Sequence, residues 1–273
     1  MERILRILLV TLIGFSLLTA GPLFIGWCEE KTYQESRETV LHFRLVITSD
    51  KPLVNKTFFL PLPLNGNVTL PSIEVKGAGS LKGSDCFSGM DLFSDRDAVF
   101  LRLIIGEVAD ITTTSRYGEE YTCTLESVDI LGHALDSEDP EKNSYVFKPR
   151  NRSHVIECPS DDGPPFPHTC YQYTTPVYVG RGTSDACITI DAIVEGTNRW
   201  RVIEQGNNAY RDRILVSLPP EANGWFSAEG VLEAGIGDED PYYKPVDKNE
   251  TSPKAPIHEL RRILSLEQTI VLF

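Results

Sequence analysis

The chain is short of positive charge. It has 26 Lys and Arg residues against 39 Asp and Glu residues, which gives a net charge of −13 at pH 7. Binding to nucleic acid needs clustered basic side chains that neutralise phosphates, and the basic residues of this chain do not cluster. We therefore expect no nucleic-acid partner, and we interpret the acidity as a property of a soluble surface.

Complete catalytic motifs are also missing. The sequence has no Gly-x-Ser-x-Gly elbow, and residues 77–84 contain Lys-Gly-Ser where a phosphate-binding loop needs Gly-Lys-Ser or Gly-Lys-Thr. The segment His258–Arg262 begins like a zinc-protease helix but has Arg262 in place of the second His ligand. We predict a protein that is not an enzyme and has no cofactor. A secreted hydrolase whose residues converge only in three dimensions is the alternative.

The N-terminus contains a long stretch without charge. Ile7 to Cys28 is a run of 22 uncharged residues, which as a helix would extend about 33 Å and span a bilayer. Basic residues precede the run and acidic residues follow it, so the bulk of the chain is predicted to be extracytoplasmic. Residues 1–28 are either an uncleaved transmembrane anchor or a cleaved signal peptide. The length of the run and Trp27 at its end favour a single-pass membrane protein.

Cysteines and glycosylation acceptors fit an exported domain. Cys158 and Cys170 bracket a proline-rich loop and are the best disulfide candidates, whereas Cys86, Cys123 and Cys187 leave an odd thiol whose pairing stays open. Asn-x-Ser/Thr acceptor sites occur at four positions, which predicts exposed loops or edges there: Asn55, Asn67, Asn151 and Asn249.

Alternating apolar residues predict about a dozen strands between residues 36 and 237. In residues 41–48, for example, Leu41, Phe43, Leu45 and Ile47 share one face. Short strands separated by turn residues, without helical periodicity, indicate a mainly β protein built as an antiparallel, immunoglobulin-like or larger β-sandwich. Residues 238–256 are acidic and proline-rich, which is typical of a linker, and residues 257–273 form a tail with helical and apolar segments.

Two weaker binding hypotheses concern loops and aromatic residues. The acidic loop at Asp136, Glu138 and Asp139 is a calcium candidate without an EF-hand pattern. An aromatic platform for a glycan is the other candidate, although core packing explains its tryptophans more simply; its members are Trp200, Trp225, Tyr210, Tyr242 and Tyr243, next to Asn207 and Asn208.

The segments 41–53 and 58–63 resemble those of uncharacterised envelope proteins from methanogenic archaea, as do the segments 210–214, 224–226 and 234–237. The resemblance implies a place in the cell envelope and no particular activity. Together with the missing motifs, it leads us to predict a membrane-anchored structural or binding module whose partner is an envelope protein or a glycan. A calcium- or glycan-binding sandwich is a further alternative.

Overall fold

A computed structural model describes most of the β-rich region. The described residues are 22, 24–66, 68–69, 82–83, 86–95, 98–107, 113–115, 118–151, 153–158, 169–180, 182, 186–202 and 204–238. The long strands are β1 (Glu38–Ser49), β2 (Val54–Asn65), β5 (Phe87–Asp95), β6 (Ala98–Glu107), β8 (Gly118–Leu131), β11 (Thr169–Val179), β12 (Ile188–Arg201), β13 (Gln205–Leu218) and β14 (Gly224–Gly237). The short elements are β3 (Val68–Thr69), β4 (Lys82–Gly83), β7 (Thr113–Ser115), α3 (Pro140–Asn143), β9 (Val146–Lys148) and β10 (His154–Ile156).

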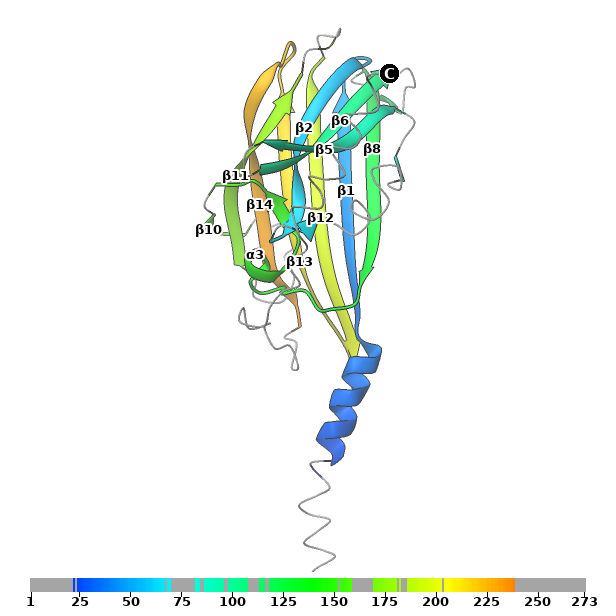
Figure 1. Ribbon diagram of the computed structural model, residues 1–273, viewed down its shortest axis with the longest axis vertical. Helices are drawn as coiled ribbons and strands as arrows, with labels where there is room; N and C mark the ends of the chain where they lie inside the picture. Colours follow the sequence, from blue (N-terminus) through cyan, green and yellow to red (C-terminus); the bar gives the residue numbers. More distant parts are fainter. Residues whose placement is uncertain are drawn as a thin grey trace, which may run out of the picture. The chain divides into compact units, whose positions relative to one another are not determined.

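The strands form one antiparallel sheet (Figure 1). The hydrogen-bonded order is β4-β8-β1-β12-β13-β14-β11-β2-β6-β5, and the other short strands pair with members of this path. The mainly antiparallel β class predicted from the sequence is confirmed. The sandwich prediction of two separate sheets differs from the structure, because β2 pairs with β11 through Phe58 and Phe59 and so joins the two layers into a barrel-like sheet.

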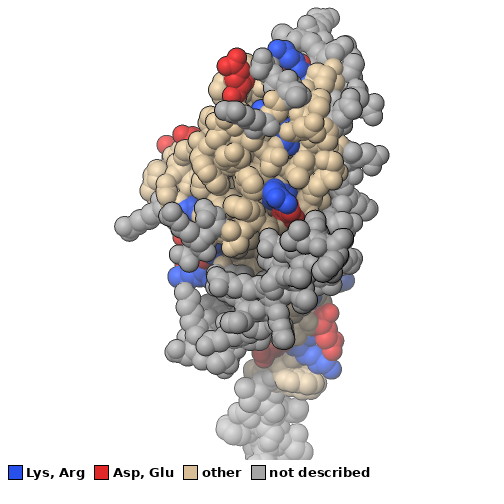
Figure 2. Space-filling view, turned by 45° about the horizontal axis from the view of Figure 1, so that its top comes forward, with Lys and Arg blue, Asp and Glu red and all other residues tan. Residues whose placement is uncertain are grey.

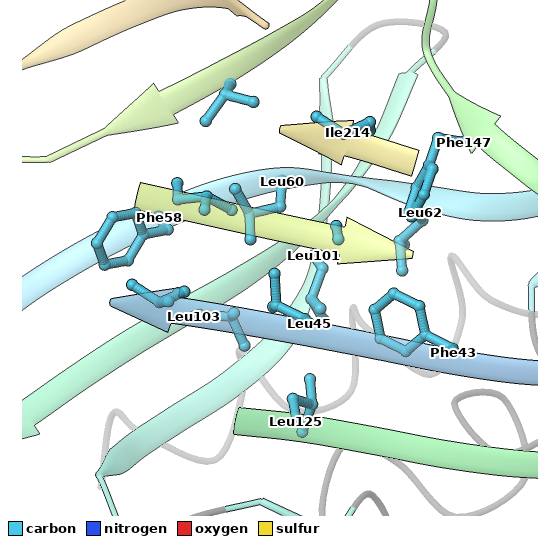
Figure 3. Close-up of a cluster of buried hydrophobic side chains, with 14 of the residues drawn as sticks. Phe43, Leu45, Phe58, Leu60, Leu62, Leu101, Leu103, Leu125, Phe147 and Ile214 are labelled. Carbon is cyan, nitrogen blue, oxygen red and sulfur yellow. The ribbon is translucent and has the colours of Figure 1, made fainter. Parts of the chain in front are cut away.

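The curvature of this sheet brings its inner faces together. Side chains from β1, β2, β6, β8 and β13 point toward one another around a shared apolar core (Figure 3). Near the two edges of the sheet, Cys86 precedes β5 and Cys123 lies in β8, which is next to the edge strand β4. This pair is at disulfide distance with its Cα atoms 6.2 Å apart. The sheet is therefore nearly closed, with a cysteine pair linking strands near its two edges.

Strand periodicity predicted the buried faces well. The predicted core residues of β1 are all at most 2% exposed, as the alternation of a half-buried strand requires. The predicted core face of β12, which includes Ile188, Ile190 and Val194, is also buried. Residues 200 and 201 end β12, and the chain turns there into β13.

A helix covering residues 24–36 leads directly into β1 (Figure 1). Tyr33 is buried against Trp200, with the ring centroids 6.3 Å apart, and the Ser36 hydroxyl donates a 2.8 Å hydrogen bond to the Arg201 carbonyl. The helix thus meets the end of the sheet where β12 turns into β13. Within the described residues, no helix has both the length and the apolar character needed to cross a membrane.

Several predicted segments lie outside the described residues. They comprise most of the predicted membrane segment, residues 1–21 and 23, as well as the linker from residue 239 and the tail 257–273. Of the four acceptor sites, Asn67 and Asn249 also lie there. These predictions stay predictions.

Candidate functional site

The outer face of the sheet carries different kinds of side chains on its two halves. On β1, β8, β12 and β13 it carries basic and acidic residues that pair across neighbouring strands. The shortest donor–acceptor distances are 2.6 Å for His42–Glu126, 3.2 Å for Arg211–Glu195 and 2.8 Å for Arg213–Asp191. Such pairs are typical of a solvated sheet face.

On the other half, aromatic side chains gather next to the Arg102–Asp91 ion pair. Five rings from five different strands form what we call the aromatic surface, consisting of Phe59 (β2), Phe93 (β5), Phe100 (β6), Tyr178 (β11) and Trp225 (β14). Figure 2 shows a face of the domain on which most described side chains are uncharged. The outer face of this sheet is therefore chemically asymmetric.

The rings meet because the strand register places them side by side. Trp225 is directly opposite Tyr178, and Tyr178 is directly opposite Phe59. The ring centroids are 5.2 Å apart in the first pair and 5.1 Å in the second. Phe59 also lies 4.7 Å from Phe93, and Trp225 lies 5.3 Å from Phe100. These separations are those of favourable aromatic pairs.

The same cross-strand row ends in an ion pair. Arg102 of β6 is opposite Phe59 and also opposite Asp91 of β5. The Arg102 Nε donates a 2.6 Å hydrogen bond to Asp91 Oδ1, and Nη2 contacts the second carboxylate oxygen. The row thus runs from Trp225 to Asp91 across five strands. The two charged residues in this row, Arg102 and Asp91, pair with each other.

Part of the aromatic surface is open to solvent. Trp225 is 50% exposed and Phe93 is 37% exposed, Phe59 and Tyr178 are half-buried, and Phe100 is buried beneath Trp225. Contiguous exposed apolar side chains mark interaction sites more often than single ones do. This arrangement is the strongest candidate binding site among the described residues.

Of the described aromatic members of the platform named from the sequence, only Trp225 is exposed at the surface. Trp200 is 5% exposed and Tyr210 is fully buried, so neither can contact a ligand at the surface. Trp225 is exposed, but its neighbours are phenylalanines and Tyr178 rather than Asn207 and Asn208. Tyr242 and Tyr243 lie outside the described residues. Ring neighbours depend on strand order and register, which alternation alone does not specify.

A second concentration of polar groups lies on the inner face. The segment 135–151, which we call the plug segment, contains α3 and β9 and is held by buried side chains of the sheet. The Asn198 side chain binds both the N–H and the carbonyl of Leu135 at 2.9 Å. The Tyr210 hydroxyl donates to the Tyr145 carbonyl at 2.8 Å and accepts from its N–H at 3.1 Å. The plug segment is therefore fixed through its backbone.

Asp212 is the charged centre of this network. Its carboxylate accepts hydrogen bonds from the Phe147 N–H at 2.9 Å and from the Tyr173 hydroxyl at 2.6 Å. It also lies 3.5 Å from the Arg150 guanidinium, which pairs with Glu141 at 3.1 Å. Complete burial outweighs the effect of Arg150 and raises the pKa of Asp212 from 3.8 to about 6.

Two glycines make room for the tyrosines of this network. Tyr173 lies over Gly230 of the neighbouring strand β14, where a Cβ atom would collide with the ring. Tyr210 lies over Gly196 of β12 in the same way. The tyrosines can therefore lean across a neighbouring strand and reach polar partners beyond it. A Gly opposite a Tyr is a weak sequence signal that could have indicated this packing.

The cysteines lie as follows. The predicted pair Cys158–Cys170 is at disulfide distance, with its Cα atoms 5.2 Å apart. Of the three cysteines whose pairing the sequence left open, Cys86 and Cys123 come together and Cys187 is free and exposed. Cys28, in the N-terminal helix, is also free.

The two described acceptor asparagines, Asn55 and Asn151, are both exposed. The Asn151 side-chain amide donates a 2.7 Å hydrogen bond to the Thr174 hydroxyl. Exposure is compatible with glycosylation, which stays a prediction.

Two of the three calcium candidates, Asp136 and Asp139, have partners within the protein. Asp136 is buried, and its carboxylate accepts a 2.9 Å hydrogen bond from the Asp139 N–H, while Asp139 pairs with Lys142. Glu138 is exposed. In the part of the chain that the structure describes, no three His, Cys, Asp or Glu residues are grouped to hold a metal ion. Calcium binding stays a prediction.

No protein-family model, no curated protein and no solved structure matches this chain.

Proposed function

We propose that this chain is a non-catalytic binding module of the cell envelope, anchored in a membrane by its N-terminus, and that the aromatic surface binds a protein partner. The observation that carries this proposal is the partly exposed ring cluster, in which Trp225 and Phe93 are open to solvent. Trp, Tyr, Phe and Arg are enriched at protein interfaces, and a few such residues supply most of the binding energy. Arg102, between Phe59 and Asp91 in the same cross-strand row, adds an arginine to these interface residue types.

The N-terminal helix supports the membrane part of the proposal. Phe24, Ile25 and Trp27 are each more than half exposed, and they belong to the uncharged stretch that ends at Cys28. Large apolar side chains on the surface of a helix favour insertion into lipid, and Trp favours the interface. The resemblance to archaeal envelope proteins agrees with this location.

The position of the aromatic surface suits an anchored module. Ser36 of the N-terminal helix contacts Arg201, which is opposite Gln205 at the start of β13. Strand β14 ends near this same end of the sheet, since Gly237 is opposite Asn208. Its first residue is Gly224, which directly precedes Trp225. The length of β14 therefore separates Trp225 from the helix end of the sheet by about 40 Å. A module anchored through that helix would present the rings away from its own membrane.

The ring geometry favours a protein over a glycan. Neighbouring rings are tilted by 50° for Phe59–Phe93 and by 60° for Tyr178–Trp225, so they do not form one flat platform for a sugar. Three of the five rings are phenylalanines, which have no hydrogen-bonding group for sugar hydroxyls. An apolar protein surface with a carboxylate or basic group near Arg102–Asp91 fits better.

The proposal is tested with surface variants of the full-length protein in detergent micelles. Trp225→Ala and Phe93→Ser should each weaken retention of the partner from solubilised envelope at least about 30-fold, because loss of a central interface aromatic costs roughly 2 kcal/mol or more. Leu215→Ser is the matched control, since Leu215 is 49% exposed but lies on β13 in the charged half.

Three results would contradict the proposal. Equal loss of the partner with Leu215→Ser would show that the effect is not specific to the rings. Binding to a glycan panel that disappears in Trp225→Ala would assign the surface to a sugar. Turnover of a substrate by the purified protein would favour the hydrolase alternative.

A further inference from the structure

The plug segment is attached to the sheet by alternate residues. Tyr145 binds Tyr210, Phe147 binds Asp212, and the Pro149 carbonyl accepts a 2.6 Å hydrogen bond from the Thr175 hydroxyl. The Asn151 N–H then donates to the Thr174 carbonyl at 2.8 Å. Of these attachments only the one at Asp212 includes a carboxylate, so its strength can change with proton uptake.

The buried Arg150 guanidinium lies close to two carboxylates. Arg150 has 7% side-chain exposure and lies closer to Glu141, at 3.1 Å, than to Asp212, at 3.5 Å. The Arg150 guanidinium also stacks over the Tyr173 ring, 4.7 Å from its centroid. Asp212 itself has no exposure to solvent. A fully buried carboxylate that shares its cation is poorly compensated when it is ionised.

The other titratable groups in this region are Tyr173, Tyr210 and Lys148. Tyr173 and Tyr210 have pKa values raised well above 10 by burial and by Asp212, so they stay neutral. Burial, followed by Arg150, lowers the pKa of Lys148 on β9. Directly opposite Asp212 are Val194 of β12 and Leu232 of β14, neither of which titrates.

We propose that Asp212 makes the plug segment a proton-sensitive closure of the sheet interior, which opens more often when Asp212 is ionised than when it is protonated. Opening lets water reach the carboxylate and frees it from the buried site. The closed form is therefore favoured by protonation.

The direction of the pH dependence follows from the two protonation states. In the closed form the pKa of Asp212 is about 6, against an ordinary value of 3.8. The stabilisation of the closed form is fully present below about pH 3.8, and it is lost as the pH rises through about 6. If the opened segment restores the ordinary pKa, the open population rises about 10²-fold over this range.

Hydrogen exchange of the full-length protein in detergent micelles tests this closure. The protection factors of the Tyr145 and Phe147 amides, corrected for intrinsic exchange, should fall about 10²-fold from pH 4 to pH 7. The amide of Val194 in β12 should not follow this change. Asp212→Asn should abolish the pH dependence, whereas Asp191→Asn, on the outer face beside Arg213, should leave it intact.

A second variant keeps the test decisive if Asp212→Asn does not fold. Tyr173→Phe removes a hydrogen bond that stabilises the ionised carboxylate, so the midpoint of the pH dependence should move upward. Equal protection at both pH values in the unsubstituted protein would overturn the proposal. So would an unchanged pH dependence in Asp212→Asn, or an unchanged or lowered midpoint in Tyr173→Phe.

Discussion

At the scale of single residues, one buried polar side chain of the inner face has all of its hydrogen-bonding groups paired. Asn198 is 1% exposed and makes four hydrogen bonds. Its amide nitrogen donates to the Leu135 carbonyl and to Asn208 Oδ1, and its oxygen accepts from the Leu135 N–H and the Thr39 hydroxyl. This uses every donor and acceptor that an asparagine amide offers.

Asn198→Ala should therefore destabilise the protein by roughly 3 kcal/mol, because it leaves several buried polar groups without their partner. Urea unfolding followed by circular dichroism measures the change in the free energy of unfolding. Asn207→Ala, on the exposed face of β13, is the control and should change it by less than about 0.5 kcal/mol. A loss of stability as small in Asn198→Ala as in the control would show that the amide network is not important.

At the scale of elements, two local connections hold the sheet in its curved form. One is the short pairing of β11 with β2, which involves two residue pairs. The other is the cysteine pair that links Cys86, before β5, to Cys123 in β8 across 37 positions of sequence. The pair Cys158–Cys170 instead closes a loop of 12 positions beside β11.

Loop length predicts which cysteine pair contributes more to the free energy of unfolding. On the chain-entropy account, removal of the longer crosslink should cost about 4 kcal/mol and removal of the shorter one about 3 kcal/mol. The double variants Cys86→Ser with Cys123→Ser and Cys158→Ser with Cys170→Ser are compared by urea unfolding under oxidising conditions. If the 86–123 variant is no less stable than the 158–170 variant, the Cys86–Cys123 pair does not stabilise the curved sheet as proposed.

Periodicity revealed which residues of each strand are buried but not which strands are neighbours. Leu41, Phe43 and Ile47 were placed on the core face correctly because alternation depends only on local geometry. The closure of the sheet depends on pairing between distant strands such as β2 and β11. Apolar alternation is weak in β5, because Ser88, Gly89 and Ser94 interrupt its apolar residues.

The candidate site was less visible in the sequence than the fold was. Phe59, Phe93 and Trp225 are far apart in the chain and become neighbours only through the register of five strands. Trp225 could be singled out as a large aromatic residue near a turn, but nothing local distinguished it from the buried Trp200. Asp212 lies between Arg211 and Arg213 and has the composition of a surface strand, although it points inward.

At the scale of the whole molecule, the proposed export has a direct chemical test. Cys187 is a free and exposed thiol at the start of β12. A membrane-impermeant maleimide added to intact cells should label the protein, and Cys187→Ser should lose most of this label. Labelling that occurs only after the cells are lysed would place the domain on the cytoplasmic side of the membrane.

The central claim, that the aromatic surface is the binding site, is tested most directly by photo-crosslinking in living cells. A photoreactive phenylalanine analogue is placed at position 225, and in a separate variant at position 215 on the charged half of the sheet. We predict that position 225 forms a discrete crosslink to one envelope protein, and that position 215 does not. A crosslink from position 215 alone, or the same product from both positions, would contradict the claim.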